Sequence, residues 1–504
     1  MRDFSDNSVG VIECRETNYP PGPFHPPVEY PEYPFKGSGI QPENQVYEAV
    51  RELFQRLGMD KEHFGSPEWN PLGDIIKMGD KVVLKPNLVI SEHELGQAGI
   101  ESATVHGSII RPFVDYAFIA LKGEGRITIG DSPIKEVDFE KIMGLIGVTD
   151  MLNFFSTTFP LVPLEIVDYR DVRAWRKPDG TIVASKKLSG DERGYTVIDL
   201  GDDSLFAEIS DHCERFRSTA TIYENVMREV HNKSTNKYSF ANTVLDADVV
   251  ISLSKMKTHR KSGVTLSLKN LVGLTNEKRW LPHHRIGTVV QGGDMMPDSA
   301  SVVDKSSGYL SDLFSSHKYG KYGYQYLVPI MKIVYKYLVR WWLHRIERGE
   351  HFEWAQGDWY GNDTVWRMVL DLNQILLYSD KKGTLYDTPQ RKYFTCVDGI
   401  IAGEKEGPLH ALPKEVGLIV GGFNPVAVDL ACIKLMGFNF KKISLMMGVD
   451  KMKRPLISDK SIIDFWEKIE VLSNQAEYEH LKDPVKRYFK FEPSAGWKGH
   501  IEID

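Results

Sequence analysis

The stretch Val249-Val-Ile-Ser-Leu253 is a short apolar run that passes directly into the basic segment Lys255-Met-Lys-Thr-His259. A continuous run of β-branched and other apolar residues is typical of a strand that is buried on both faces. Similar runs occur at Lys81–Leu84, Arg126–Ile129 and Val416–Val420, and stretches with helical spacing lie between them. Strands that alternate with helices predict an α/β fold with a mostly parallel, helix-covered sheet.

The clearest helix signal follows the last of these runs. Asn424 is suited to the N-cap position, Pro425 to the first helical position and Gly437 to the stop. A second helix is expected over Asp363–Tyr378, inside a long helical, aromatic-rich insertion. The expected organisation is a Pro-rich N-terminal arm (1–44), a first core part (45–275, with a hairpin insertion at about 168–200), the helical insertion (276–390), a second core part (391–450) and a C-terminal tail (451–504).

Composition excludes several classes of protein. The 504 residues are 42% hydrophobic and 26% charged, as in ordinary globular proteins, and the net charge is −7, so no nucleic-acid partner is expected. The four cysteines are scattered and form no C-x-x-C pair, and the start of the chain has no apolar signal segment. These features predict a cytoplasmic protein. The most apolar long stretch, Leu327–Ile346, contains three basic residues, so no transmembrane segment is expected.

Polar side chains follow one predicted strand after another. Lys85 and Asn87 follow the first strand, Asp131 the second, and Lys257 and His259 the third. Ligands of open α/β sheets bind at the carboxyl ends of the strands, so these side chains predict a site at that edge.

The region from Val249 to Gly293 holds eight Lys or Arg residues and a single acid, Glu277. A cleft lined by one sign of charge concentrates an oppositely charged substrate, here a phosphate or carboxylate. Lysine beside other cations loses its proton more readily, and histidine transfers protons near neutral pH. We expect Lys257, His259, Lys269 and Asp131 to be catalytic. The expected substrate-binding residues are Lys85, Asn87, His106, Arg260, Lys261 and Asn270.

A divalent metal, Mg²⁺ or Ni²⁺, is a further expectation. Oxygen ligands suit Mg²⁺, and Asp131, Asp398, Glu404 and Asp429 could supply them in a transferase or hydrolase of phosphorylated substrates. Across both metals, the residues that we favour as ligands are His259, His283, His284, Asp398 and Glu404. Turn glycines and surface acids are the competing interpretation of the region Gly399–Gly407.

These segments resemble the bacterial and archaeal family known as domain of unknown function 362. The matching segments are Gly79–Leu88, Thr104–His106, Gly130–Pro133, Lys255–Leu274, Asp398–Pro408 and Asn424–Asp429. Members of this length are encoded near surface-polysaccharide genes, so the resemblance implies carbohydrate chemistry.

A fainter resemblance concerns His259-x-x-Ser262-Gly263-x-Thr265-x-x-x-Lys269, which is similar in spacing to the signature of nickel-pincer lactate racemases. That resemblance implies an acid–base role for His259, a cofactor tether at Lys269 and nickel ligation near His283 and His284. Leu266 and Ser267 replace two glycines of that signature, so a shared fold is favoured over a shared cofactor.

Three functions remain open. The first is an enzyme, racemase- or epimerase-like, that acts on an anionic hydroxy acid, sugar acid or phosphorylated glycan precursor in polysaccharide metabolism. The second is the Mg²⁺-dependent transferase or hydrolase, and the third is a non-catalytic scaffold at a polysaccharide or membrane surface. Four residues spaced by four form a cationic helical stripe that suits a packed insertion helix, peripheral membrane contact or a lid over a glycan: Lys332, Lys336, Arg340 and His344.

Overall fold

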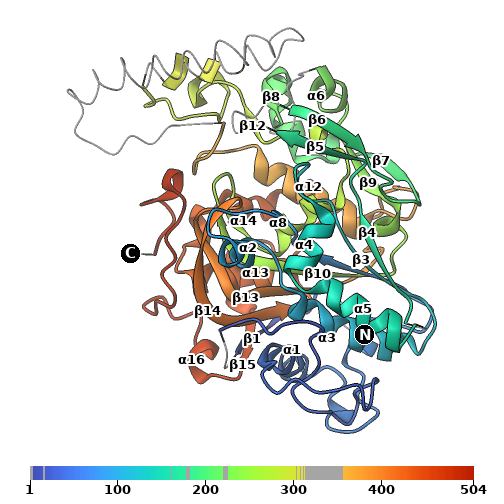
Figure 1. The fold of residues 1–504 in the computed structure, drawn as a ribbon. Coiled ribbons are helices and arrows are strands. Elements are labelled where there is room, and N and C mark those ends of the chain that lie inside the picture. Colours follow the sequence, from blue (N-terminus) through green and yellow to red (C-terminus); the bar gives the residue numbers. More distant parts are fainter. Residues whose placement is uncertain are drawn as a thin grey trace.

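The structure is a computed structural model that describes residues 4–14, 17–160, 162–176, 182–218, 225–301, 304–306, 308–309, 312 and 356–503. Its centre is a nine-stranded sheet (Figure 1). The order is β15-β1-β14-β13-β10-β2-β3-β4, and β11 pairs with β10 outside this path. The strands are β1 (Ser8–Glu13), β2 (Lys81–Pro86), β3 (Arg126–Asp131), β4 (Leu164–Asp168), β10 (Val249–His259), β11 (Gly263–Thr265), β13 (Lys392–Glu406), β14 (His410–Gly422) and β15 (Glu470–Ser473).

The mostly parallel sheet that the sequence predicts is confirmed. Parallel pairs join β13, β10, β2, β3 and β4, while β14 runs antiparallel to both of its neighbours. The strand β10 extends to His259, six residues beyond the predicted apolar run. The segment Gly399–Gly407, for which turns were one interpretation, lies mostly in β13 and ends beside it.

Helices cover both faces of the sheet, as expected for parallel strands (Figure 1). Side chains alternate between the faces: Val82 and Leu84 of β2 pack in one core with α1 and α3, and Val83 packs in the other core with α12 and α13. The helices are α1 (Gln45–Arg56), α2 (Gln97–Ala103), α3 (Gly107–Leu121), α4 (Phe139–Leu145), α5 (Val148–Thr158), α6 (Asn225–Val230), α7 (Asn242–Leu245), α8 (Ser267–Asn270), α12 (Val365–Tyr378), α13 (Pro425–Met436), α14 (Ser444–Met447), α15 (Ile462–Lys468) and α16 (Ala476–Glu479).

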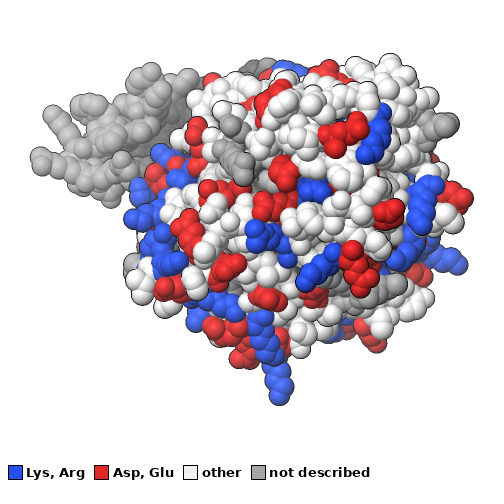
Figure 2. All heavy atoms as spheres, turned by 90° about the horizontal axis from the view of Figure 1, so that it is seen from below, with Lys and Arg blue, Asp and Glu red and all other residues white. Residues whose placement is uncertain are grey.

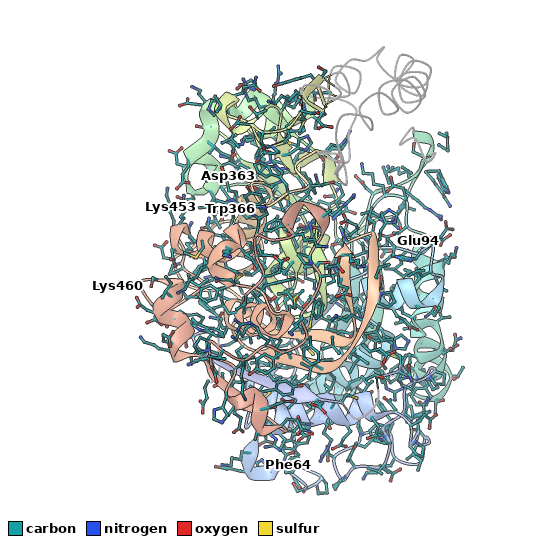
Figure 3. All side chains as sticks on the ribbon, turned by 90° about the vertical axis from the view of Figure 1, so that its left-hand side faces the viewer. Phe64, Glu94, Asp363, Trp366, Lys453 and Lys460 are labelled. Carbon is teal, nitrogen blue, oxygen red and sulfur yellow. The ribbon has the colours of Figure 1, made fainter. Side chains whose placement is uncertain are left out.

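Both predicted helices form, and α13 begins at its predicted N-cap. The side chain of Asn424 accepts the N–H groups of Val426 and Ala427 at the start of α13, and the helix ends at Gly437 with a φ of 85°. At the start of α12, Asp363 accepts a hydrogen bond from the Trp366 indole at 3.0 Å, and both side chains are labelled in Figure 3.

Three small sheets flank the core. The expected hairpin insertion contains the antiparallel pair β5 (Val172–Arg176) and β6 (Ile182–Lys187). The other pairs are β7 (Tyr195–Asp199) with β9 (Lys237–Ala241), and β8 (Phe216–Arg217) with β12 (His284–Arg285).

Both ends of the chain take part in the central sheet, which the sequence analysis did not anticipate. The strand β1, from the expected arm, lies between β14 and β15, and β15 comes from the expected tail. The Pro-rich part of the arm is anchored by buried aromatic side chains, among them Phe24, Tyr33 and Phe35. No helix among the described residues is long and apolar enough to cross a bilayer. The cationic stripe at Lys332 lies outside the described residues.

Candidate anion-binding site

A cavity of about 510 Å³ lies where β2, β3 and β10 end. This is the sheet edge at which the sequence predicts a site, and the volume is typical of small-molecule sites. Seven Lys or Arg residues and three acids line it, with both imidazoles of His259 and His283 and an apolar wall. The charged lining residues are Lys85, Asp131, Lys135, Glu136, Lys257, Arg260, Lys261, Lys269, Lys278 and Asp358.

The segment β10–β11–α8 brings its lysines together by folding back on itself. Gly263 has a φ of +79° and lets the chain reverse, so that Lys257 lies opposite Thr265 across the β10–β11 pair. Asp429 of α13 then accepts the N–H groups of Ser267 at 2.7 Å and Leu268 at 3.0 Å. These bonds satisfy orphan donors at the start of α8, the short helix that carries Lys269 and Asn270.

Lys85, Asp131 and Asn270 form a closed network at the base of the cavity. The Lys85 ammonium lies 2.9 Å from Asp131 Oδ1 and donates to Asn270 Oδ1 at 2.7 Å. The carboxylate of Asp131 also accepts the N–H groups of Leu88 and Ser132, both at 2.8 Å. Burial raises the pKa of Asp131, and Lys85 opposes that shift. Asp131 is thus the counter-ion of Lys85 and lines the cavity, where its expected catalytic role stays a prediction.

Three other lysines of the cavity have no carboxylate partner among the described residues. The Lys257 ammonium donates to the carbonyl of Ala103, and that of Lys278 donates to the carbonyl of Val272 at 2.7 Å. Lys269 makes neither an ion pair nor a hydrogen bond with the described residues, although it is only 8% exposed. Buried charges are ordinarily paired, so this cluster lacks negative charge.

The burial of these lysines without carboxylate partners lowers their pKa values. Burial, assisted by Lys85 and Lys261, lowers the pKa of Lys269 to about 8. Burial likewise lowers the pKa of Lys278 to about 7 against the pull of Asp131, and lowers that of Lys257 far below its usual value. At neutral pH the cavity therefore holds ammonium groups that are close to losing their protons.

The two histidines of the cavity are held in opposite tautomers by the backbone. Nδ1 of His259 accepts the N–H groups of Lys261 at 3.0 Å and Ser262 at 3.3 Å, so the neutral ring carries its proton on Nε2. Nδ1 of His283 instead pairs with the carbonyl of Leu281 at 2.7 Å and must be the protonated nitrogen, which leaves Nε2 with a lone pair. Burial lowers the pKa of His283 to about 3, so this ring is neutral at pH 7.

Three small polar groups of the lining have no partner among the described residues. Oδ1 of Asn87, Oγ of Ser132 and Oγ1 of Thr265 are buried atoms without a hydrogen bond. Each unpaired buried group is costly, and a ligand can pair with these atoms after a side-chain rotation that turns them toward the cavity. Asn87 was expected to bind substrate and Ser132 to lie at this sheet edge, whereas Thr265 was not assigned to the site.

Several expected site residues have other roles. His106 caps α3 and stacks on Tyr19 with ring centroids 4.2 Å apart, outside the cavity lining. Lys261 and Arg260 line the cavity but share one partner, Asp358, at 2.8 Å and 3.6 Å. Asp358, inside the expected insertion, was missed because no sequence signal links it to β10.

The expected metal ligands are not brought together. Asp398 binds Lys255 at 2.9 Å and accepts the Tyr19 hydroxyl at 2.6 Å, whereas Glu404 pairs with Lys414. His284 lies in β12, and the proton on His259 Nε2 leaves that ring no free lone pair toward the cavity. Within the part of the chain that the structure describes, no three His, Cys, Asp or Glu side chains are placed to hold a metal ion.

Lys278 was counted in the basic segment of the sequence but was not assigned to the site. Lys278 is far from β10 along the chain, so the sequence did not predict that it lines the cavity. On the outer face in Figure 2, Lys and Arg are interspersed with Asp and Glu. The uncompensated cations therefore belong to the cavity rather than to a basic patch on that face.

Comparisons with known proteins give a family and a distant structural likeness. Residues 205–434 match the family model described as "Domain of unknown function (DUF362)". No curated protein matches the chain. A crystal structure of a protein from Thermotoga maritima aligns with 77% of this chain at 12% sequence identity and a TM-score of 0.32, and the chain spans 58% of that protein's length. A likeness at that level carries no argument about function.

Proposed function

We propose that this chain, which matches the DUF362 family model through residues 205–434, is an enzyme that binds an anionic small molecule and performs acid–base chemistry on it. The observation that carries the proposal is the set of three buried lysines without carboxylate partners: Lys257, Lys269 and Lys278. A buried ammonium without a counter-ion destabilises the folded protein. An anion that enters the cavity removes this penalty, which gives the site its affinity.

The chemical roles follow from the hydrogen-bonding state of each group. Nε2 of His283 has a lone pair, and it can accept a proton from the substrate once a bound anion offsets the burial and the lysine charges that lower its pKa to about 3 in the empty cavity. Nε2–H of His259 is suited to donate to a substrate oxygen, and the Lys269 amine, with a pKa of about 8, to stabilise developing negative charge. This assignment adds His283, which the sequence analysis named only as a metal-ligand candidate, to the expected acid–base group of Lys257, His259 and Lys269.

The cytoplasm is the compartment that we propose for this activity. The cysteines Cys14, Cys213, Cys396 and Cys432 are all free thiols, which suits a reducing environment. The link to surface-polysaccharide metabolism, the racemase-like reaction and peripheral membrane contact remain predictions.

A ligand screen followed by an exchange assay tests the proposal. Melting temperatures of the full chain are measured with hydroxy acids, sugar acids and sugar phosphates; a ligand at 100 times its Kd stabilises by about 2.7 kcal/mol. The best ligand is then incubated with the protein in deuterated water. We expect incorporation of deuterium at a carbon beside the anionic or carbonyl group, and loss of incorporation in His283→Asn. A screen in which no anion stabilises the protein would refute the proposal.

A further inference from the structure

We infer that the ligand of the cavity is a phosphorylated polyhydroxy compound, a class that combines one phosphoryl dianion with free hydroxyl groups. The inference rests on the proposed function, because it names the class of anion that the same site takes. It draws on two features of the lining, the uncompensated ammonium groups and the neutral groups without partners.

The ammonium groups match a phosphoryl group better than a carboxylate. A phosphate monoester carries about −1.5 to −2 charges at pH 7 and three strong acceptor oxygens. Lys257, Lys269 and Lys278 line one cavity, and a phosphoryl dianion beside them favours the protonated form of all three, whose pKa values burial lowers in the empty site. A single carboxylate would leave most of this charge uncompensated. The acids Asp131 and Asp358 are already paired with Lys85 and Lys261.

The neutral groups match hydroxyls. A hydroxyl both donates and accepts, and the cavity offers one fixed imidazole donor, His259 Nε2–H, and one fixed imidazole acceptor, His283 Nε2. The side chains of Asn87, Ser132 and Thr265 also line the cavity, and their enclosed, unpaired oxygens can meet a ligand hydroxyl after a rotation of the side chain. These three residues are between 2% and 8% exposed, so water does not replace a missing partner freely.

The size of the cavity exceeds what an inorganic ion fills. At about 510 Å³ it has room for a ligand with a carbon skeleton beside the lysines. Apolar side chains, including Leu88, Val272 and Leu281, form part of the wall and suit the C–H faces of such a skeleton. The cavity is thus divided into a cationic part and a neutral hydrogen-bonding part.

Calorimetric titration of the full chain at pH 7 tests the inference with five probes: glucose 6-phosphate, glycerol 3-phosphate, inorganic phosphate, gluconate and glucose. We expect at least one of the two phosphorylated polyols to bind about tenfold or more tighter than both inorganic phosphate and gluconate, since each added neutral hydrogen bond contributes roughly a factor of three to ten. Lys269→Met should weaken the binding of every anion. The matched control is Lys460→Met, at an exposed lysine on the outer flank in Figure 3, which should leave binding unchanged.

Two asparagine variants test the hydroxyl part of the inference. His259→Asn keeps an acceptor for the backbone N–H groups, and His283→Asn keeps a donor for the Leu281 carbonyl, while each removes Nε2. We expect the advantage of the phosphorylated polyol over inorganic phosphate to fall below about threefold in either variant. Thr265→Val, which changes the fold least, should reduce the same ratio and serves if an asparagine variant does not fold.

The outcomes separate the inference from the proposed function. Gluconate binding as tightly as glucose 6-phosphate and glycerol 3-phosphate would overturn the phosphoryl class and leave the anion site standing. Inorganic phosphate binding as tightly as both polyols would overturn the hydroxyl part. Absence of binding by all four anions would overturn both the inference and the proposed function.

Discussion

Lys269 and Lys278 determine how the cavity responds to pH. Their pKa values, lowered by burial to about 8 and about 7, lie where small changes of pH alter their charge. Both are cationic below pH 7 and neutral above pH 8, so an anion finds its strongest partner at the acidic end of this window. Lysines at the surface would show no such dependence below pH 10.

Sulfate is a suitable probe of this dependence because its own charge does not change over the range. We expect the Kd of sulfate, measured by calorimetry at constant ionic strength, to rise about tenfold or more between pH 6.5 and pH 9. The direction follows from the loss of the ammonium protons through pH 7 to 8. A sulfate affinity that stays constant across this range would contradict the assignment of the two lysines to the site.

The free energy of unfolding of the ligand-free protein should rise with pH because of Lys269, whereas the affinity for sulfate falls. The folded pKa of about 8 lies below the unfolded value of 10.5, so the unfolded chain binds the proton more tightly between these values and stability rises with pH there. Below pH 8 the full penalty of the buried charge is present. Lys269→Met should therefore raise the melting temperature at pH 7 by a few degrees, and a clear decrease would show that the ammonium is compensated.

At the scale of elements, the short helix α8 depends on a residue of α13. The carboxylate of Asp429 holds the N–H groups of Ser267 and Leu268, and its pKa is raised to about 7 by burial. The cavity is therefore positioned by a contact between segments that lie 160 residues apart. The helices α8 and α13 therefore position the site together.

Replacement of Asp429 tests this coupling. In Asp429→Ala two buried N–H groups lose their acceptor, so the free energy of unfolding in urea should fall by roughly 2–4 kcal/mol. Asp429→Asn keeps one acceptor oxygen and should lose about half as much. Both variants should also weaken the binding of sulfate, because α8 carries Lys269. A variant that is destabilised but binds sulfate with the wild-type Kd would show that α8 does not depend on this contact.

Local sequence signals predicted the helices and strands around the cavity better than the contacts of the side chains that line it. The strand runs, the N-cap Asn424 and the stop Gly437 depend on neighbouring residues, and the structure confirms them. The tautomers of His259 and His283 depend on backbone bonds that only the folded chain forms. A pairing such as Lys255 with Asp398 joins strands that are distant in sequence, so Asp398 could not be separated from the metal-ligand candidates in advance.

At the scale of the whole molecule, distant segments complete the sheet and enclose the site. The strands β1 and β15 pair in parallel although nearly the whole chain separates them, and Trp497, near the end of the chain, packs against Gly263 at the turn that shapes the cavity. Composition and periodicity carry no information about such pairings. The pairing of β1 with β15 and the packing of Trp497 against Gly263 make the N-terminal arm and the C-terminal tail parts of the core fold.

The most direct test of the central claim, that uncompensated lysines of the cavity bind an anion, is the Kd of sulfate at pH 6.5 for three proteins. The account predicts that the wild type and Lys460→Met bind sulfate with the same Kd and that Lys269→Met binds it at least about tenfold more weakly. Equal affinity in Lys269→Met and the wild type, or no sulfate binding by the wild type, would contradict the account.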